Sequence, residues 1–415
     1  MKCVKLNTNF ILGKYKGDIP HEDFFSKHYT KTCMYTLVDK KLVVLPRMLV
    51  LKRSMVVAFL LCSSVAFTQV AKYSNEFLAI GVSARALAMG GASVVSCNDV
   101  SAGYFNPANL LKIKPKFQLA LMHAEYWAGI SKYDYGAFST RIDSNSVASV
   151  SIIRYGTDNI PNTLNLIDAN GNVNYNQIST FAVTNFAALL SYARKIPKLK
   201  GVNVGATAKI IRNKLGPFGG SWGFGFDIGA SYSYKKWSFA AVAHDITGTF
   251  NAYSYNLTAS QQQTFAATGN TIPSNSTEVT VPRLILGVSR TFDVWKNRLT
   301  IIPEINLVTT FDGRRNEVVS TKPFSIDPLI GLEICYLQII YLRAGMNNIQ
   351  QATNIDGKSN WIVSPSIGVG IRYKGVRLDY ALTNFGGDNG GIGLYSNIFS
   401  LRVDVKSLHL PKAKA

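Results

Sequence analysis

The sequence has few charged residues and, beyond residue 69, no apolar run long enough to form a membrane-spanning helix. Charged residues make up only 16% of the 415 residues, whereas hydrophobic residues make up 47%. A helix that crosses a bilayer needs about 20 consecutive apolar residues. The apolar residues of the main body must therefore be distributed in another way. The 33 glycines and the 11% aromatic content favour the alternating pattern of a β-barrel.

Cysteine is also scarce, and the sequence has no spacing typical of a metal site. Cys3, Cys33 and Cys62 precede residue 69, so the main body holds only Cys97 and Cys335. Two cysteines in an oxidising compartment can pair, and the sequence leaves both a disulfide and two free thiols open. We expect no metal and no cofactor.

Acidic residues are too few to balance the basic ones, which gives a net charge of +20. The first 69 residues hold eleven Lys and Arg against four Asp and Glu, so part of this excess lies outside the main body. The other basic residues occur mostly singly, at turns or alternate strand positions. This distribution indicates a solvated lumen and rims, and it argues against nucleic acid as a partner.

A Sec-type signal peptide is predicted over residues 48–69. Lys52 and Arg53 precede a short apolar stretch that begins at Met55, and small or polar residues follow it. The stretch is too short to span a bilayer comfortably, which argues against the alternative of a membrane anchor. We expect cleavage near Thr68 or Gln69, and we interpret residues 1–47 as an untranslated or disordered extension.

From residue 117 onward, apolar residues recur at every second position, as they do on one face of a β-strand. Between Ser221 and Tyr232, large apolar residues alternate with Gly, Ser and one Asp. A soluble sandwich would carry Lys and Glu on its second face, so small residues there indicate a crowded lumen. The alternating segments are 117–127, 133–142, 147–154, 178–193, 202–211, 221–233, 237–246, 283–291, 299–310, 325–336, 339–347, 362–373, 376–382 and 398–405.

These segments predict an all-β transmembrane fold, an antiparallel outer-membrane β-barrel of about 14 strands with a small N-terminal helical hatch. Bacterial barrels have an even strand number, short periplasmic turns and longer external loops. The predicted links nearly alternate in this way, with 247–282 as the longest loop and only 128–132 short on the outer side. We expect the hatch at 70–116, the barrel at 117–405, a periplasmic tail at 406–415, and location in the cell outer membrane.

Aromatic residues near the predicted strand ends are typical of the girdles at the two membrane interfaces. They are Tyr126, Trp127, Tyr234, Trp237, Trp295, Trp361 and Tyr373.

Charged residues inside the predicted strands are candidates for lumen ion pairs. The clearest are Arg377 with Asp379 and Arg402 with Asp404, in the last two strands. We interpret them as mutual neutralisation of buried charge, with a transport filter as the alternative. The other expected lumen charges are Lys209, Asp227, Glu304 and Arg372.

Two histidines are the only plausible bases for an enzyme. His123 lies two residues before Glu125 in the first segment, and His244 precedes Asp245 in the seventh. Catalysis would require a serine and a carboxylate placed to relay a proton. The pattern favours rim or lumen histidines instead, so we predict no catalytic residue and a non-enzymatic protein.

Small residues dominate the predicted hatch, notably from Gly81 to Gly91 and around Asn106-Pro107-Ala108. Together with the final strands around Leu378 to Leu382, these residues resemble the PorV/PorQ family of Bacteroidota outer-membrane proteins. That family is itself similar to FadL-type barrels of fourteen strands with an N-terminal hatch. Within this segment, the residues expected to pack in the lumen are Arg85, Met89, Gly90, Asn106 and Pro107.

The resemblance implies a protein-interaction role in type IX secretion, either docking to the translocon or receiving the C-terminal domains of secreted cargo. The expected partners are outer-membrane lipid, the translocon and cargo, with one barrel acting within a larger complex. Tyr253, Tyr255 and Phe265 are the candidate partner-binding residues in the longest predicted loop. The alternative is a FadL-like channel for hydrophobic small molecules.

Overall fold

The computed structural model describes residues 74–167, 171–295, 298–353, 357, 359–383 and 395–405. The predicted signal peptide, the segment before it and the predicted tail at 406–415 lie outside the described residues.

Fourteen strands form one closed antiparallel sheet, as the alternation predicted. The sheet closes where the first strand pairs with the last, from Phe117 opposite Val405 to Glu125 opposite Asn397. In order around the wall, the strands are β1 (Phe117–Tyr126), β2 (Ser131–Arg141), β3 (Ser146–Asn162), β4 (Ser179–Lys195), β5 (Val202–Leu215), β6 (Gly219–Tyr234), β7 (Trp237–His244), β10 (Arg283–Arg290), β12 (Leu299–Thr310), β14 (Ser325–Tyr336), β15 (Ile340–Thr353), β16 (Ser359–Tyr373), β17 (Val376–Thr383) and β18 (Ser396–Val405).

The outside of the barrel is apolar and the inside is polar, which is the reverse of a soluble sheet. On β6, Trp222, Phe224 and Phe226 are exposed, whereas Ser221 and Asp227 are buried. A closed sheet leaves no unpaired backbone edge, and an apolar exterior is stable only in contact with lipid. The protein is therefore an outer-membrane barrel.

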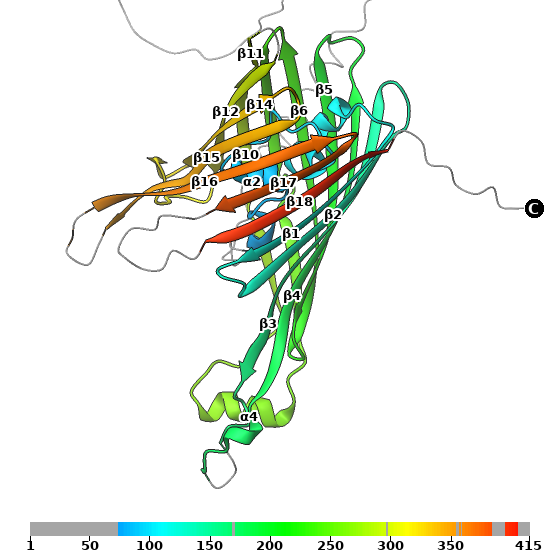
Figure 1. The fold of residues 1–415 in the computed structure, drawn as a ribbon. Coiled ribbons are helices and arrows are strands. Elements are labelled where there is room, and N and C mark those ends of the chain that lie inside the picture. The colour runs from blue at the N-terminus through cyan, green and yellow to red at the C-terminus, as the bar shows by residue number, and fades with distance from the viewer. Residues whose placement is uncertain are drawn as a thin grey trace, which may run out of the picture. The chain divides into compact units, whose positions relative to one another are not determined.

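The barrel has a short-turn end and a long-loop end. At the short-turn end, most strands are joined by turns of a few residues, such as 235–236 and 374–375. At the long-loop end, β3 to β6 extend beyond the other strands toward the α-helix α4 (Ala259–Ala267), as Figure 1 shows. A short 3-10 helix, η3 (Tyr175–Gln177), lies in the loop between β3 and β4.

The prediction of residues 247–282 as a single loop is wrong. This segment contains β8 (Thr249–Tyr255), which pairs with β6, and β9 (Ser276–Thr280), which pairs with β8. Both lengthen the wall beyond β7 and β10. The alternation was obscured at two places. The apolar pattern breaks between His244 and Thr249, and Pro282, which has no backbone N–H, interrupts the segment between β9 and β10.

Other expected boundaries shift as well. The link predicted at 212–220 shrinks to residues 216–218, because β5 and β6 continue pairing to Leu215 and Gly219. Two short strands, β11 (Phe292–Val294) and β13 (Val319–Ser320), lie in the links on either side of β12.

Of the seven residues predicted for the girdles, six are exposed, as a girdle requires, but Tyr126 is not. Tyr126 is only 5% exposed and points inward, with its ring 6.1 Å from that of Tyr133. His123 and Glu125 point outward together with Leu119 and Leu121. The charges of Glu125 and its neighbours therefore mark where β1 leaves the apolar band.

The N-terminal hatch, described from Ser74 to Lys116, packs inside the barrel. It consists of short helices: η1 (Glu76–Leu78), α2 (Ala84–Ala88), α3 (Ala102–Phe105) and η2 (Pro107–Lys112). Among the described residues, none of the helices has the length and apolarity needed to cross a bilayer.

Candidate functional site: the plugged lumen

The hatch fits the lumen because small residues let its backbone touch the wall. Gly90 adopts a left-handed φ of +63°, and a Cβ atom there would lie 2.6 Å from the backbone nitrogen of Met346. A Cβ atom at Gly345 would overlap the backbone of Met89. Glycine at both positions thus permits backbone-to-backbone contact.

Arg85 of α2 binds the wall through a buried carboxylate. Its guanidinium donates to both oxygens of Glu333 on β14, at 2.9 and 3.1 Å. The same carboxylate accepts from Arg343 at 2.7 Å and from Arg377 at 3.3 Å. Asp379 completes the cluster, 3.0 Å from both arginines. Three arginines and two carboxylates therefore join the hatch to β14, β15 and β17.

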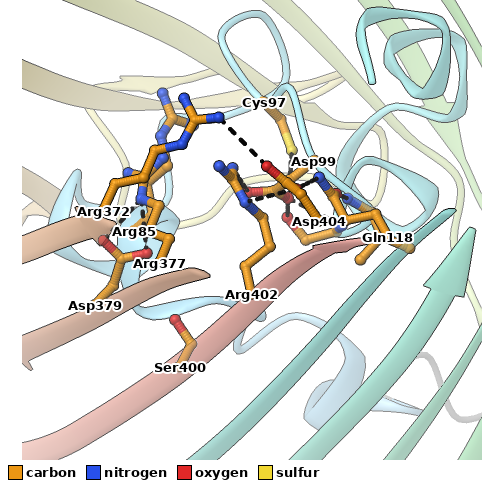
Figure 2. Close-up of polar contacts among 12 residues, drawn as sticks. Arg85, Cys97, Asp99, Gln118, Arg372, Arg377, Asp379, Ser400, Arg402 and Asp404 are labelled. Carbon is orange, nitrogen blue, oxygen red and sulfur yellow. Dashed lines mark hydrogen bonds and ion pairs between the residues drawn. The ribbon is translucent and has the colours of Figure 1, made fainter. Parts of the chain in front are cut away.

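A second cluster joins the hatch to the seam between β1 and β18. Arg402 lies 3.6 Å from Asp99 of the hatch and 3.6 Å from Asp404, between the two carboxylates in Figure 2. Gln118 of β1 accepts from the Val100 amide at 2.7 Å and donates to Asp404 at 2.6 Å. The hatch is thus bound where the first and last strands meet.

Asp99 is ionised within this cluster. Burial by itself raises the pKa of its carboxyl, but Arg402 and hydrogen bonding from Ser101 outweigh burial, so the pKa lies below its ordinary value. Nearby, burial raises the pKa of the Cys97 thiol to about 12. Cys97 and Cys335 are both free thiols, which settles the alternative that the sequence left open.

Further contacts hold the hatch at other points of the wall. Glu304 on β12 accepts from the amides of Val95 and Ser96, both at 2.8 Å. Asn106 donates to the Val94 carbonyl at 3.0 Å and more weakly to the wall at Ala230, 3.3 Å away. These contacts surround the hatch, which therefore plugs the lumen rather than lying along one side.

A cavity of about 290 Å³ lies against the hatch. Its apolar lining comes from both the hatch and the wall: Leu78, Leu87, Tyr104, Phe105, Leu189, Ile285, Val308 and Leu329. Arg315, Glu317 and Asp327 line it as well. The cavity thus offers a mixed surface on which apolar side chains are accompanied by many charged and polar groups. Sites for small molecules likewise combine apolar side chains with placed polar groups.

One wall of the cavity carries ion pairs that do not involve the hatch. Lys209 lies 2.8 Å from Asp227 and also contacts Asp245. His244 lies 3.1 Å from Asp227, and Arg283 lies 3.7 Å from Asp245. These groups neutralise one another across β5, β6, β7 and β10.

The wall is interrupted beside the same cavity. β7 and β8 are separated by 245–248, and Asp245 has a positive φ of 55°. On the facing segment, Val281 and Pro282 separate β9 from β10, and both residues line a second cavity of about 30 Å³. The polar groups of the larger cavity, including Arg283, therefore lie next to a break in the strand pairing.

The structure brings some of the predicted site residues together and separates others. Arg85, Met89, Asn106 and Pro107 are buried in the hatch, and Arg377–Asp379 and Arg402–Asp404 are neighbouring pairs. Glu333 and Arg343, which connect Arg377 to the hatch, were missed. Arg343 is the one charged residue of β15, and Glu333 shares β14 only with Asp327, so little besides their inward position in the alternation distinguishes them.

The candidate partner-binding residues and the histidines are widely distributed. Tyr253 lies on β8 and its hydroxyl accepts from Asn213 at 3.2 Å, Tyr255 ends the same strand, and Phe265 lies on α4. His123 points outward and contacts Asp134 at 2.7 Å, whereas His244 contacts Asp227 at the cavity. The two histidines therefore do not form one site.

Together, the closed wall, the buried hatch and the cavity define a plugged outer-membrane barrel. Neither family models nor curated proteins match the sequence. Similar solved structures include the CymD monoaromatic hydrocarbon channel, with a TM-score of 0.48, 12% identity, and coverage of 80% of this chain and 99% of that one.

Two further structures with a similar fold are a toluene transporter and a FadL homologue. The Ralstonia pickettii toluene transporter TbuX has a TM-score of 0.47 and 13% identity, and covers 78% of this chain and 98% of its own. A Pseudomonas aeruginosa FadL homologue has a TM-score of 0.44 and 13% identity, with coverage of 81% and 99%. At these values, the similarity does not establish a family or function for this chain.

Proposed function

We propose that the protein is a non-enzymatic outer-membrane channel that takes a small, largely apolar molecule with a polar group into the cavity beside the hatch. The observation that carries this proposal is the cavity itself. Apolar side chains of hatch and wall line it, while Lys209, Asp227, His244 and Arg283 supply polar groups on one wall and Arg315, Glu317 and Asp327 add further charge. A purely structural plug has no need of such a cavity.

Passage requires the hatch to move or the molecule to leave sideways. The hatch is bound by two charged clusters on the β14–β18 side, so a straight path along that side is blocked. The break between β7 and β8, and the break between β9 and β10, lie beside the cavity instead. This geometry favours movement on the β5–β10 side.

Two adjacent leucines on β4 provide a matched test. Leu189 points into the cavity and is 1% exposed, whereas Leu190 points outward and is 53% exposed. Leu189→Trp fills the cavity, and Leu190→Trp places the same group in lipid. Binding and uptake of radiolabelled naphthoate are measured with the barrel in nanodiscs and in liposomes.

We expect saturable naphthoate binding by the wild type and by Leu190→Trp, and at least about tenfold weaker binding by Leu189→Trp. Uptake into liposomes should follow the same order. Equal binding and uptake by all three proteins would contradict a channel that uses this cavity.

The second candidate function is the protein-interaction role in type IX secretion. Its supporting observation is the link between β3 and β4 at the long-loop end, in which Ile167, Val173 and Tyr175 are exposed. Exposed apolar residues on an external loop suit a protein partner better than a small solute.

Pull-down from native membranes tests this role: replacing these three residues with Ser should abolish recovery of a translocon component or cargo domain. If the wild type recovers neither, this role is wrong.

A further inference from the structure

The two ends of the barrel differ in charge. The described loops at the long-loop end contain three basic and two acidic residues. These loops are 127–130, 163–178, 216–218, 256–275 and 311–324. At the short-turn end, Asp143 and Asp293 are the only acidic residues in the described turns. The basic residues within these turns or two residues of them, or just before β1, are Lys114, Lys116, Arg141, Arg194, Lys195, Lys198, Lys200, Lys235, Lys236, Arg290, Arg298, Arg372, Lys374 and Arg377, of which Arg377 is buried in the lumen.

Eight of these cations lie on three consecutive turns and form what we call the basic arc. The arc consists of Arg194, Lys195, Lys198, Lys200, Lys235, Lys236, Arg290 and Arg298. Backbone hydrogen bonds place its turns side by side, because Ser233 donates to the Gly201 carbonyl at 3.2 Å and Thr291 donates to the Lys236 carbonyl at 2.9 Å. Within the described residues, Asp293 is the one acidic neighbour that pairs with the arc, 3.4 Å from Lys236.

Several cations of the short-turn end lie over aromatic rings that face the lipid. Lys235 lies 5.3 Å from the ring of Tyr234, and Arg298 lies 5.7 Å from that of Trp295. Outside the arc, Lys374 lies 5.1 Å from the ring of Tyr373. Exposed Tyr and Trp at strand ends mark the level of the lipid headgroups. The cations therefore lie at headgroup level on the outer side of the wall, not in the lumen.

Arg290 is the clearest member of the arc. Its guanidinium lies 4.9 Å from the ring of Trp237 and 4.6 Å from that of Phe292. Its Nε is buried without a hydrogen-bond partner, and among the described residues no carboxylate pairs with it. The two rings hold the guanidinium in place, while its charge is left for a ligand outside the protein.

We propose that the basic arc binds the phosphate groups of anionic phospholipids in the leaflet at the short-turn end. Such lipids present a phosphodiester anion at the level where these cations lie, with acyl chains that can pack on Trp237 and Phe292. Basic clusters at membrane interfaces bind anionic headgroups in this manner. A soluble acidic protein fits less well, because Arg290 lies between lipid-facing rings rather than on the turn tips.

The proposal is tested by lipid retention in native mass spectrometry. The folded barrel is purified in detergent and incubated with equal amounts of phosphatidylglycerol and phosphatidylcholine of the same acyl chains. The arc variant is Lys235→Gln/Lys236→Gln/Arg290→Gln. The control variant Lys214→Gln/Arg314→Gln/Lys322→Gln removes the same charge at the long-loop end. Heat-dependent migration on gels verifies that each barrel is folded.

We expect the wild type and the control variant to retain phosphatidylglycerol about tenfold over phosphatidylcholine, and the arc variant to retain the two lipids nearly equally. A single Arg290→Gln variant should lose part of the preference. Retention without preference by the wild type, or equal losses in the arc and control variants, would overturn the proposal.

Discussion

The buried charges of the wall have different partners on the two sides of the lumen. On the β14–β18 side, Glu333 and Arg402 of the wall pair with Arg85 and Asp99 of the hatch. On the β5–β10 side, the charges of the wall pair with one another, and the hatch is held by neutral hydrogen bonds, as from Thr207 to the Gly103 carbonyl at 2.9 Å. Separating a hatch charge from its partner is costly, whereas breaking a neutral bond costs little. The hatch is therefore fixed by ion pairs on one side and held by neutral contacts on the other.

The largest loss of stability should come from Glu333→Gln, which removes the carboxylate shared by three buried arginines. Removing one partner from a buried ion cluster leaves uncompensated charge, so we expect a loss of about 3–5 kcal/mol in the free energy of unfolding. Urea unfolding of the barrel in lipid vesicles measures it. Asp134→Asn, at an exposed cluster on the outer wall, is the control and should cost at most about 1 kcal/mol. Similar values for both variants would remove the basis of the comparison.

The next change tests the two sides directly. Arg85→Met removes the charged contact to Glu333, for which we expect a loss of about 2–3 kcal/mol, and Thr207→Val removes the neutral contact to Gly103, for which we expect about 1 kcal/mol. Hydrogen exchange should accelerate at α2 in the first variant and at α3 in the second. The comparison fails if Thr207→Val frees the hatch as much as Arg85→Met does.

Close backbone contact on the fixed side is tested by Gly345→Ala. The added methyl group would overlap Met89, so the hatch or β15 must shift, at a cost of about 1–3 kcal/mol. Gly136→Ala is the matched control, because its methyl group would meet only the Leu121 side chain at 3.6 Å. Stability measured by the same urea titration should be unchanged in the control. A loss of equal size in both variants would point to strand propensity instead of hatch contact.

The smallest effect depends on pH. Asp99 has a lowered pKa in the folded protein, so its contribution to stability is present above the ordinary carboxyl pKa of about 3.9 and is lost as pH falls through the folded value. Asp99→Asn should therefore be less stable than the wild type at pH 7, and the difference should narrow below about pH 4. Unfolding measured across this range checks the sign, and a difference that widens in acid would contradict it.

Much of the wall could be predicted from the sequence because strand alternation is local. Trp222 to Tyr232 gives both the strand and its orientation, and its small inward residues indicate the lumen. The pairing of Glu333 with Arg85 could not be derived in this way, because the two residues are 248 positions apart and their contact depends on the register of several strands. β8 and β9 were missed because Asp245 and Pro282 break the alternation on which the prediction rests.

The positions of the hatch and of its partners in the sequence limit when the hatch can bind the wall. The hatch is made before any strand, yet its partners Glu333, Arg377 and Arg402 belong to the last part of the chain. Contacts between such distant residues form late, since the intervening chain must first be positioned. The plug can therefore seat only after the final strands are in place. Arg85 and Asp99 of the hatch can reach their partners on the wall only once those strands have paired.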